Sequence, residues 1–159
     1  MDTVSWNDAR AFITKLNQMT GRRYRLPTEA EWGYAPRSGG KKEKWSGTSD
    51  LSQPGNYAWY HEDNGEKTCV VGTKRPNSLG LYDVGGNVWE WVQDFYGDVW
   101  YKESPGNNPQ GPRTGTLKEL RGGSWGNGEG FLRATGRFAV EPAFRFAFSG
   151  GFRFAAPSR

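Results

Sequence analysis

Residues 120–125 read Leu-Arg-Gly-Gly-Ser-Trp, and residues 151–155 read Gly-Phe-Arg-Phe-Ala. Each stretch combines apolar or aromatic side chains with an arginine and contains or adjoins glycine, a pattern typical of short strands beside tight turns. The segment between them is rich in Gly, Ala and Phe and follows neither a helical nor a strand period. We therefore expect two short strands that frame a long irregular segment, and we expect function in that segment.

The composition of the whole chain favours one domain with a core of large rings. The chain has 159 residues, including eight Trp, seven Tyr, nine Phe and 23 Gly. This length is sufficient for a single hydrophobic core. Each buried ring removes a large apolar area from water, so that few are needed. We predict a single domain over residues 1–159 with many turns and few long elements.

Charge and cysteine content exclude several function classes. The formal net charge is +4, from 21 basic and 17 acidic residues, and the arginines after position 120 stand singly instead of forming a block. We expect no nucleic-acid binding, and we expect these arginines to bind backbone carbonyls of long loops. Cys69 and His61 are the only residues of their types, so no intrachain disulfide or zinc cluster of thiolates and imidazoles can form. No apolar run is long enough to span a bilayer, and residues 1–3 lack a signal-peptide core.

Two helices are predicted near the start of the chain. The first begins at Ser5 and ends near residues 20–21, and the second begins at Thr28 and ends at Pro36. In both, an acidic residue stands three positions after the Ser or Thr, which is the pattern of a capping box. Short strands are expected at residues 70–72, 88–92, 120–125 and 151–155. The pattern predicts an α+β fold with long loops around a small sheet.

Five motifs in order resemble one known family. Besides the two opening stretches, they are Val-Ser-Trp-x-Asp-Ala at 4–9, Tyr-Arg-Leu-Pro-Thr-Glu-Ala-Glu-Trp at 24–32, and Gly-Leu-Tyr-Asp-Val-x-Gly-Asn-Val-Trp-Glu-Trp at 80–91. Together they resemble the formylglycine-generating-enzyme (sulfatase-modifying factor) domain, a variant of the C-type lectin fold. The resemblance implies two helices and a small antiparallel sheet with long structured loops. Family domains usually carry strands before the first motif, so this chain is either a minimal version or lacks upstream sequence.

The resemblance also bears on catalysis. Formylglycine formation in the resembled enzymes depends on a cysteine pair that binds copper just after the Gly-Gly-Ser-aromatic motif, and Cu(I) prefers such soft thiolates. Residues 126–131 contain no cysteine, and Cys69 lies far away in the sequence. We therefore expect a chain that is not an enzyme and requires no cofactor. The alternatives are a sulfatase-modifying-factor-type enzyme and an enzyme-derived structural domain.

One subgroup of the resembled family consists of variable proteins that diversity-generating retroelements mutate at adenines, mostly in AAC codons. The resulting codons encode Gly, Ala, Val, Phe and Ser, among others, but not Glu or Lys. The chain keeps the subgroup's frame at Arg137, Pro142 and Arg145, and we take Glu129 and Glu141 as fixed scaffold. The residues within about 125–150 that AAC can reach, and that we predict to bind ligand, are Gly126, Gly128, Gly130, Phe131, Gly136, Phe138, Ala139, Val140, Phe144, Phe146, Ala147, Phe148 and Ser149.

This resemblance implies a non-catalytic ligand-binding protein for receptor recognition or display, with a protein or cell-surface ligand. A stiff frame would hold the loop backbone while its side chains change, so binding would cost little conformational entropy. The alternative is that Phe138, Phe144, Phe146 and Phe148 fill the core. For Phe152 and Phe154, in the terminal strand motif, we expect burial.

The resemblance further implies a structural calcium ion at the turn before the Gly-Asn-x-Trp-Glu-Trp motif. Carried over by position, its ligands would be the side chains of Asp83 and Glu90 and the backbone carbonyls of Gly86 and Val88. Such oxygen ligands suit a hard cation. The alternative is that Asp83 and Glu90 accept hydrogen bonds from backbone N–H groups.

Overall fold

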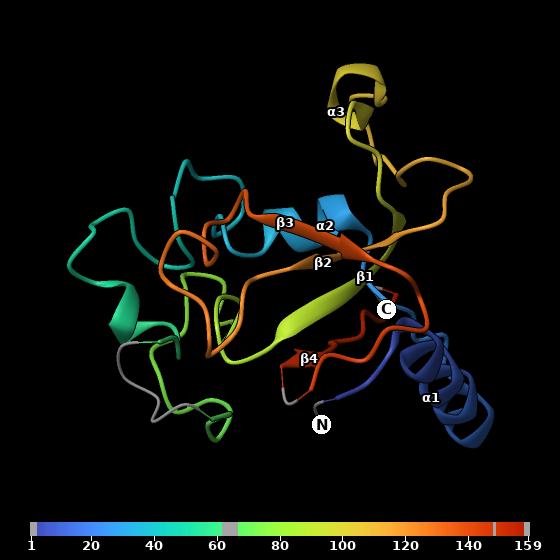
Figure 1. Ribbon diagram of the computed structural model, residues 1–159, viewed down its shortest axis with the longest axis horizontal. Coiled ribbons are helices and arrows are strands. Elements are labelled where there is room, and N and C mark those ends of the chain that lie inside the picture. The colour runs from blue at the N-terminus through green and yellow to red at the C-terminus, as the bar shows by residue number, and fades with distance from the viewer. Residues whose placement is uncertain (1–2, 62–66, 148, 158–159) are drawn as a thin grey trace.

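The computed structural model describes residues 3–61, 67–147 and 149–157. In chain order its elements are α1 (Trp6–Thr20), α2 (Glu29–Tyr34), the 3-10 turn η1 (Pro54–Asn56), β1 (Trp89–Phe95), the short helix α3 (Trp100–Glu103), β2 (Lys118–Arg121), β3 (Arg137–Val140) and β4 (Gly150–Gly151). The helices and long loops surround one small sheet (Figure 1). The predicted α+β class is confirmed.

Both predicted helices begin at their predicted caps. At α1 the pair is Ser5 and Asp8, and at α2 it is Thr28 and Glu31. In each pair the hydroxyl oxygen accepts a hydrogen bond from the backbone N–H of the acidic residue, whose carboxylate accepts one from the backbone N–H of the cap. α1 ends at Gly21, whose φ of 67° is a left-handed conformation that glycine adopts without strain.

The four strands form a mixed sheet in the order β3-β2-β1-β4. β1 with β2 and β2 with β3 are antiparallel, whereas β4 runs parallel to β1. The expected sheet was purely antiparallel. β4 differs because the chain after β3 returns past the start of α1, where Asn7 N–H donates to Pro142 O and Val4 N–H donates to Gly150 O.

The expected strand at residues 70–72 is wrong. The side chains of Val70 and Val71 are 75% and 74% exposed, and Gly72 occupies a turn with φ of 74°. Two valines in sequence favour a strand by propensity, but no strand among the described residues pairs with them, and β propensity reflects packing in a sheet. The apparent strand signal therefore belongs to a surface loop.

The opening motif at 120–125 is half strand and half turn. β2 stops at Arg121 because Gly122 and Gly123 have φ of 95° and 72°. A Cβ at Gly122 would lie 3.0 Å from Val84 O, so the close approach of two loops also requires glycine. The second motif supplies only β4, although Ala155 pairs with Arg25 in an isolated bridge. β3 was not predicted, because its four residues lie within the irregular-looking segment.

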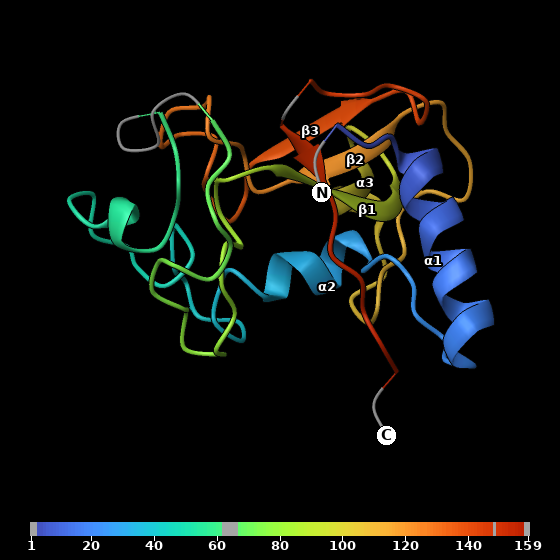
Figure 2. The ribbon, with the colours of Figure 1, turned by 90° about the horizontal axis from the view of Figure 1, so that it is seen from below.

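Large rings fill the core on both faces of the sheet, as the composition predicted. Trp89, Trp91 and Leu120 pack with the buried face of α1, and Trp32 of α2 packs with Val92 from the other face. Figure 2 shows α2 beneath the sheet and α1 at one end of it, with the loops between α2 and β1 gathered at the opposite end. Trp89 and Trp91 are buried, and Trp125 of the opening motif is half-buried.

We expect Trp91→Ala to lower the free energy of unfolding by about 3–5 kcal/mol, because the side chain is 0% exposed and its truncation leaves a cavity. The indole Nε1–H also donates to Val4 O at 2.8 Å, and this bond would be lost. Urea unfolding followed by circular dichroism measures the change. Val70→Ala is the control and should change stability by less than about 0.5 kcal/mol. Equal effects of the two substitutions would contradict the assigned core.

An aromatic face held by buried ion pairs

Three phenylalanines of the candidate segment are exposed around β3. Phe131, Phe138 and Phe144 have exposed fractions of 53%, 39% and 49%. Trp89 lies beneath two of them, with its ring centroid 6.3 Å from that of Phe131 and 5.5 Å from that of Phe138. The alternative that Phe138 and Phe144 fill the core therefore does not hold.

Phe146 connects these exposed rings to the core. Its ring centroid lies 5.7 Å from Phe138, 4.8 Å from Phe144 and 6.5 Å from the buried Trp91. Phe146 is half-buried and packs against the α1 core cluster. We call Phe131, Phe138, Phe144 and Phe146 the aromatic face. It is a continuous set of rings anchored on buried tryptophans.

The other candidate residues differ in their exposure and in the room available for a side chain. Gly126, Gly128 and Gly130 are exposed, and an added Cβ would meet nothing within 4 Å. Gly136 differs, because a Cβ there would lie 2.8 Å from Phe131 O. Ala147 is exposed, whereas Ala139, Val140 and Ser149 are half-buried, and Phe148 lies outside the described residues. The described backbone therefore accommodates side chains at the first three glycines and resists one at Gly136.

The two phenylalanines of the terminal motif differ from expectation in one case. Phe152 is half-buried and packs against the core cluster that includes Trp89. Phe154 is 46% exposed, so its predicted burial is wrong. It lies past the end of β4 and makes an edge-to-face contact with Tyr24, at 4.8 Å between ring centroids.

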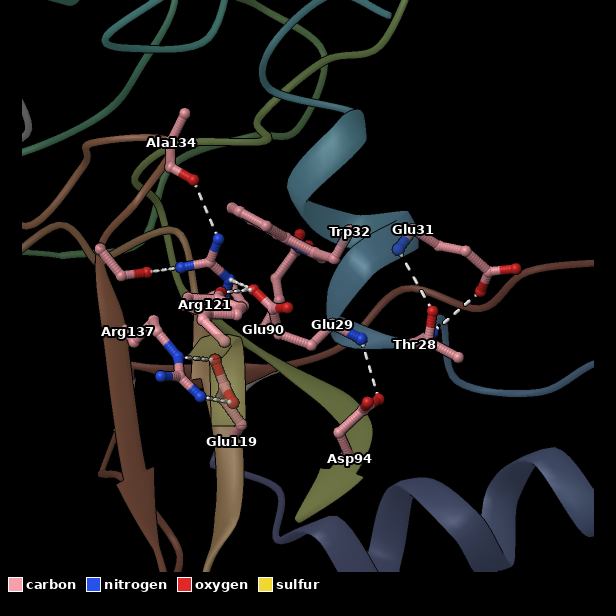
Figure 3. A network of polar contacts seen from close by, with 12 residues as sticks. Thr28, Glu29, Glu31, Trp32, Glu90, Asp94, Glu119, Arg121, Ala134 and Arg137 are labelled. Atoms are coloured by element: carbon pink, nitrogen blue, oxygen red, sulfur yellow. Dashed lines mark hydrogen bonds and ion pairs between the residues drawn. The ribbon is translucent and has the colours of Figure 1, made fainter. Parts of the chain in front are cut away.

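A buried ion pair joins β3 to β2 (Figure 3). Arg137 Nε and Nη2 donate to the two carboxylate oxygens of Glu119 at 2.7 and 2.8 Å, and the Glu119 side chain is 1% exposed. The guanidinium also lies over the rings of Tyr96 and Tyr101 at 4.6 and 4.5 Å. The hydrogen bonds to Glu119 raise the pKa of Arg137, while burial raises the pKa of Glu119. Arg137, predicted as part of a fixed frame, therefore anchors the strand that carries Phe138.

Arg121 holds the loop that precedes β3. Its guanidinium is buried and donates to Ala134 O at 2.9 Å and to Gly136 O. Arg121 Nε lies 3.2 Å from Glu29 Oε1 as an ion pair without hydrogen-bond geometry. The guanidinium carbon also lies 4.9 Å from the centre of the Trp32 ring. One cation thus ties the loop to β2 and α2, as Figure 3 shows.

Side chains outside the predicted frame also fix the segment. Asn127 Oδ1 accepts hydrogen bonds from both the N–H and the hydroxyl of Ser124 at 2.9 Å. Trp45 Nε1–H donates to Glu129 O at 2.8 Å, and Trp45 packs with the buried Leu132. Trp45 was not among the residues predicted for this segment. A Trp within a Gly-, Ser- and Lys-rich stretch was the signal that it had a buried contact.

The carboxylates of Asp83 and Glu90, the proposed calcium ligands, already accept hydrogen bonds from other groups of the protein. Both oxygens of Glu90 accept from Arg153, at 2.6 Å each, and Glu90 Oε2 also accepts from Trp32 Nε1 at 2.7 Å. Asp83 Oδ2 accepts from Gly72 N–H at 2.7 Å, which leaves only its buried Oδ1 without a partner. Because an ion bound at Glu90 would stand beside a guanidinium, these residues do not fit calcium.

The remaining two calcium candidates, Gly86 and Val88, lie in the turn between the two acids. Gly86 has φ of 78° and donates its N–H to Gly122 O at 2.9 Å, so the turn is built to pack against the opening motif. Among the described residues, no group of three or more His, Cys, Asp or Glu side chains is arranged to hold a metal ion.

A third buried acid positions α2. Asp94 Oδ2 accepts from Glu29 N–H at 2.8 Å, and Asp94 is 3% exposed. Burial raises its pKa from 3.8 to about 6, and the neighbouring carboxylates of Glu29 and Glu119 act in the same direction.

We expect Asp94 to make stability fall as the pH rises from about 4 to about 7. An acid with a raised pKa binds its proton more tightly in the folded state, so the stabilisation from protonated Asp94 is present below its unfolded pKa and is lost as pH rises through about 6. The loss is on the order of 3 kcal/mol. Urea unfolding at several pH values should show it in the wild type relative to Asp94→Asn, which keeps an acceptor for Glu29 N–H. Parallel pH curves for the two proteins would contradict it.

We expect Glu119→Gln to destabilise the protein by about 3 kcal/mol and to speed hydrogen exchange in residues 134–140. The substitution leaves a buried guanidinium without its counter-charge. Arg145→Met is the matched control, because the Arg145–Asp8 pair is 60% and 34% exposed and should contribute less than about 1 kcal/mol. Unchanged exchange in β3 with Glu119→Gln would show that the pair does not hold the strand.

The fold, the glycine turns and the buried ion pairs define a C-type-lectin-like α+β domain with an irregular loop region over a small sheet. The model of the sulfatase-modifying factor enzyme 1-like domain matches residues 1–157. The chain belongs to this family.

Curated relatives support the same assignment. The formylglycine-generating enzyme of Streptomyces coelicolor is 40% identical over 133 residues, covering 77% of this chain and 40% of the relative. The enzyme of the same name from Thermomonospora curvata is 39% identical over 136 residues, covering 77% and 43%. The chain thus spans about two fifths of the length of these relatives.

A solved structure is similar over nearly the whole chain. Treponema denticola variable protein 1 superposes with a TM-score of 0.92 and 31% sequence identity, covering 98% of this chain and 70% of that one. The expected resemblance to both the enzyme family and the variable proteins is confirmed. None of the described helices is long and apolar enough to cross a membrane.

The expectation that the chain is not an enzyme is contradicted. Four curated relatives at 36–40% identity are named formylglycine-generating enzyme. The expectation rested on the absence of a cysteine pair at residues 126–131. The absence of one set of metal ligands bears on one reaction and does not decide whether a domain of an enzyme family is catalytic.

Proposed function

We propose that the aromatic face binds a protein or cell-surface ligand. The observation that carries this proposal is the exposure of Phe131, Phe138 and Phe144 over a backbone that buried arginines hold in place. Monomeric proteins rarely expose several large rings side by side without a partner, and aromatic anchors dominate binding energy at interfaces. The proposal concerns binding and does not depend on whether the domain also catalyses a reaction.

The rigidity of the face favours recognition. Glu119 and Glu29 lie under β3 and its preceding loop and hold Arg137 and Arg121, which in turn hold the backbone. Because the loop is ordered before the ligand arrives, binding loses little conformational entropy. Side chains on such a backbone can change without unfolding it.

We further propose that residues within 126–149 vary among copies of this protein through a diversity-generating retroelement. The likeness to Treponema denticola variable protein 1 supports this proposal. So does the open space at Gly126, Gly128 and Gly130, where any side chain could project outward. A template copy of the encoding segment that differs only at adenines, beside a reverse transcriptase gene, is the expected genomic neighbour. A neighbourhood without either would remove the diversification proposal and leave the binding proposal standing.

We expect the triple variant Phe131→Ser, Phe138→Ser, Phe144→Ser to lose ligand binding with only a modest change in melting temperature. A partner captured by cross-linking to the wild-type chain is purified, and its affinity is measured by surface plasmon resonance. The loss should exceed about 2 kcal/mol, because aromatic anchors are removed. Phe146 is left unchanged because it packs against Trp91.

The control is the pair Tyr34→Ser and Tyr82→Ser, which removes exposed rings away from the aromatic face, 57% and 43% exposed. This control should bind as the wild type does. If the triple variant binds equally well while folded, the aromatic face is not the binding site. If it unfolds, the three rings belong to the core.

A further inference from the structure

A second site lies away from the aromatic face. An open pocket of about 580 Å³ lies between the start of α1, the end of β1, the start of β2 and residues 105–113. Its size is within the range of small-molecule sites. Aromatic and cationic side chains line it, among them Trp6, Arg10, Phe95, Trp100, Arg113 and Lys118. No residue of the aromatic face lines this pocket, so the site is independent of the proposed function.

Lys118 is a buried ammonium in the wall of the pocket. It is 6% exposed, and its Nζ lies 4.2 Å from the Trp6 ring centroid and 3.5 Å from that of Phe95. Nζ also donates to Gln93 O at 2.9 Å. The rings and the carbonyl stabilise the cation only in part, and burial lowers the pKa of Lys118 to about 8.

Positive charge exceeds negative charge around the pocket. Arg10 lies 5.2 Å from the centre of the Trp6 ring and repels Lys118, and Arg113 is exposed in the same lining. Among the described residues that line the pocket, Asp94 is the one acid; its Oδ2 accepts from Glu29 N–H, and its negative charge favours the ammonium form of Lys118. Three cations therefore share one carboxylate.

The remaining lining is mixed, with the amide side chains of Gln93, Asn108 and Gln110 beside aromatic and proline surface. Trp6, Phe95 and Trp100 contribute rings, and Pro105 and Pro112 contribute apolar surface. A small hydrated anion would supply charge but leave these surfaces in contact with water. A ligand with a planar ring and one carboxylate satisfies both features, because rings pack on rings and the carboxylate accepts from the cations.

We propose that this pocket binds a small aromatic carboxylate, with its carboxylate toward Lys118, Arg10 and Arg113 and its ring against the aromatic wall. The carboxylate of the ligand adds a second negative charge near Lys118, beside that of Asp94. The proline- and glycine-containing loop at 105–113 forms the outer wall.

Isothermal titration with phenylacetate tests the proposal, with acetate as the charge-only probe and benzyl alcohol as the ring-only probe. Phenylacetate should bind at least about tenfold more tightly than either. Arg10→Gln and Arg113→Gln should each weaken it about threefold, since both cations are exposed. Lys15→Gln, an exposed cation of α1 that does not line the pocket, and Phe131→Ser should leave the affinity unchanged.

A second readout follows Lys118 itself. In protein labelled with 13C-lysine, and with the signal assigned by Lys118→Met, the pKa of Lys118 should rise from about 8 when phenylacetate saturates the site. The proposal is overturned if phenylacetate gives no binding to folded protein, if acetate or benzyl alcohol binds equally well, or if the pKa of Lys118 does not move. None of these results bears on ligand binding by the aromatic face, so the two proposals are tested independently.

Discussion

The buried guanidinium of Arg121 is the constraint on which the rest of the structure depends. A cation taken out of water is costly unless every partner is in place, and the partners of Arg121 come from two other parts of the chain. Glu29 is at the start of α2, the Trp32 ring is one turn later, and the carbonyls of Ala134 and Gly136 belong to the loop before β3. Satisfying this single group therefore fixes α2, the sheet and the irregular loop relative to one another. A second ion pair, between Arg137 of β3 and Glu119 of β2, holds the neighbouring strand in the same way.

Local chemistry made the helices, the central strand and the fold class predictable. The capping boxes at Ser5 and Thr28 are complete within four residues, so sequence alone contains their geometry. β3 was missed because its pairing partner, β2, is separated from it by a loop of 15 residues, 122–136, and its own residues carry no alternation. The Val70–Val71 pair was predicted as a strand from its β propensity alone. No strand among the described residues pairs with it.

The candidate site was predictable in outline and not in detail. The frame arginines and the candidate phenylalanines could be located by family resemblance, but their surroundings depend on contacts between distant segments. Phe154 was expected inside and is exposed, and Glu90 was expected at a cation and is paired with Arg153. Whether a glycine tolerates a side chain depends on how its loop folds back on itself: a Cβ at Gly136 would meet Phe131 O, whereas one at Gly130 would meet nothing within 4 Å.

The order of strands places β3 at one border of the sheet, within the segment proposed to vary. A border strand offers unpaired main-chain groups on which another chain can add, and apolar substitutions there increase the risk of self-association. β3 has only four residues, begins with the half-buried Arg137 and is followed by Glu141 and Pro142, which lacks an N–H donor. These features limit how far a foreign strand can extend along the border. Variants that keep these features can carry apolar side chains at the neighbouring positions with a lower risk of self-association.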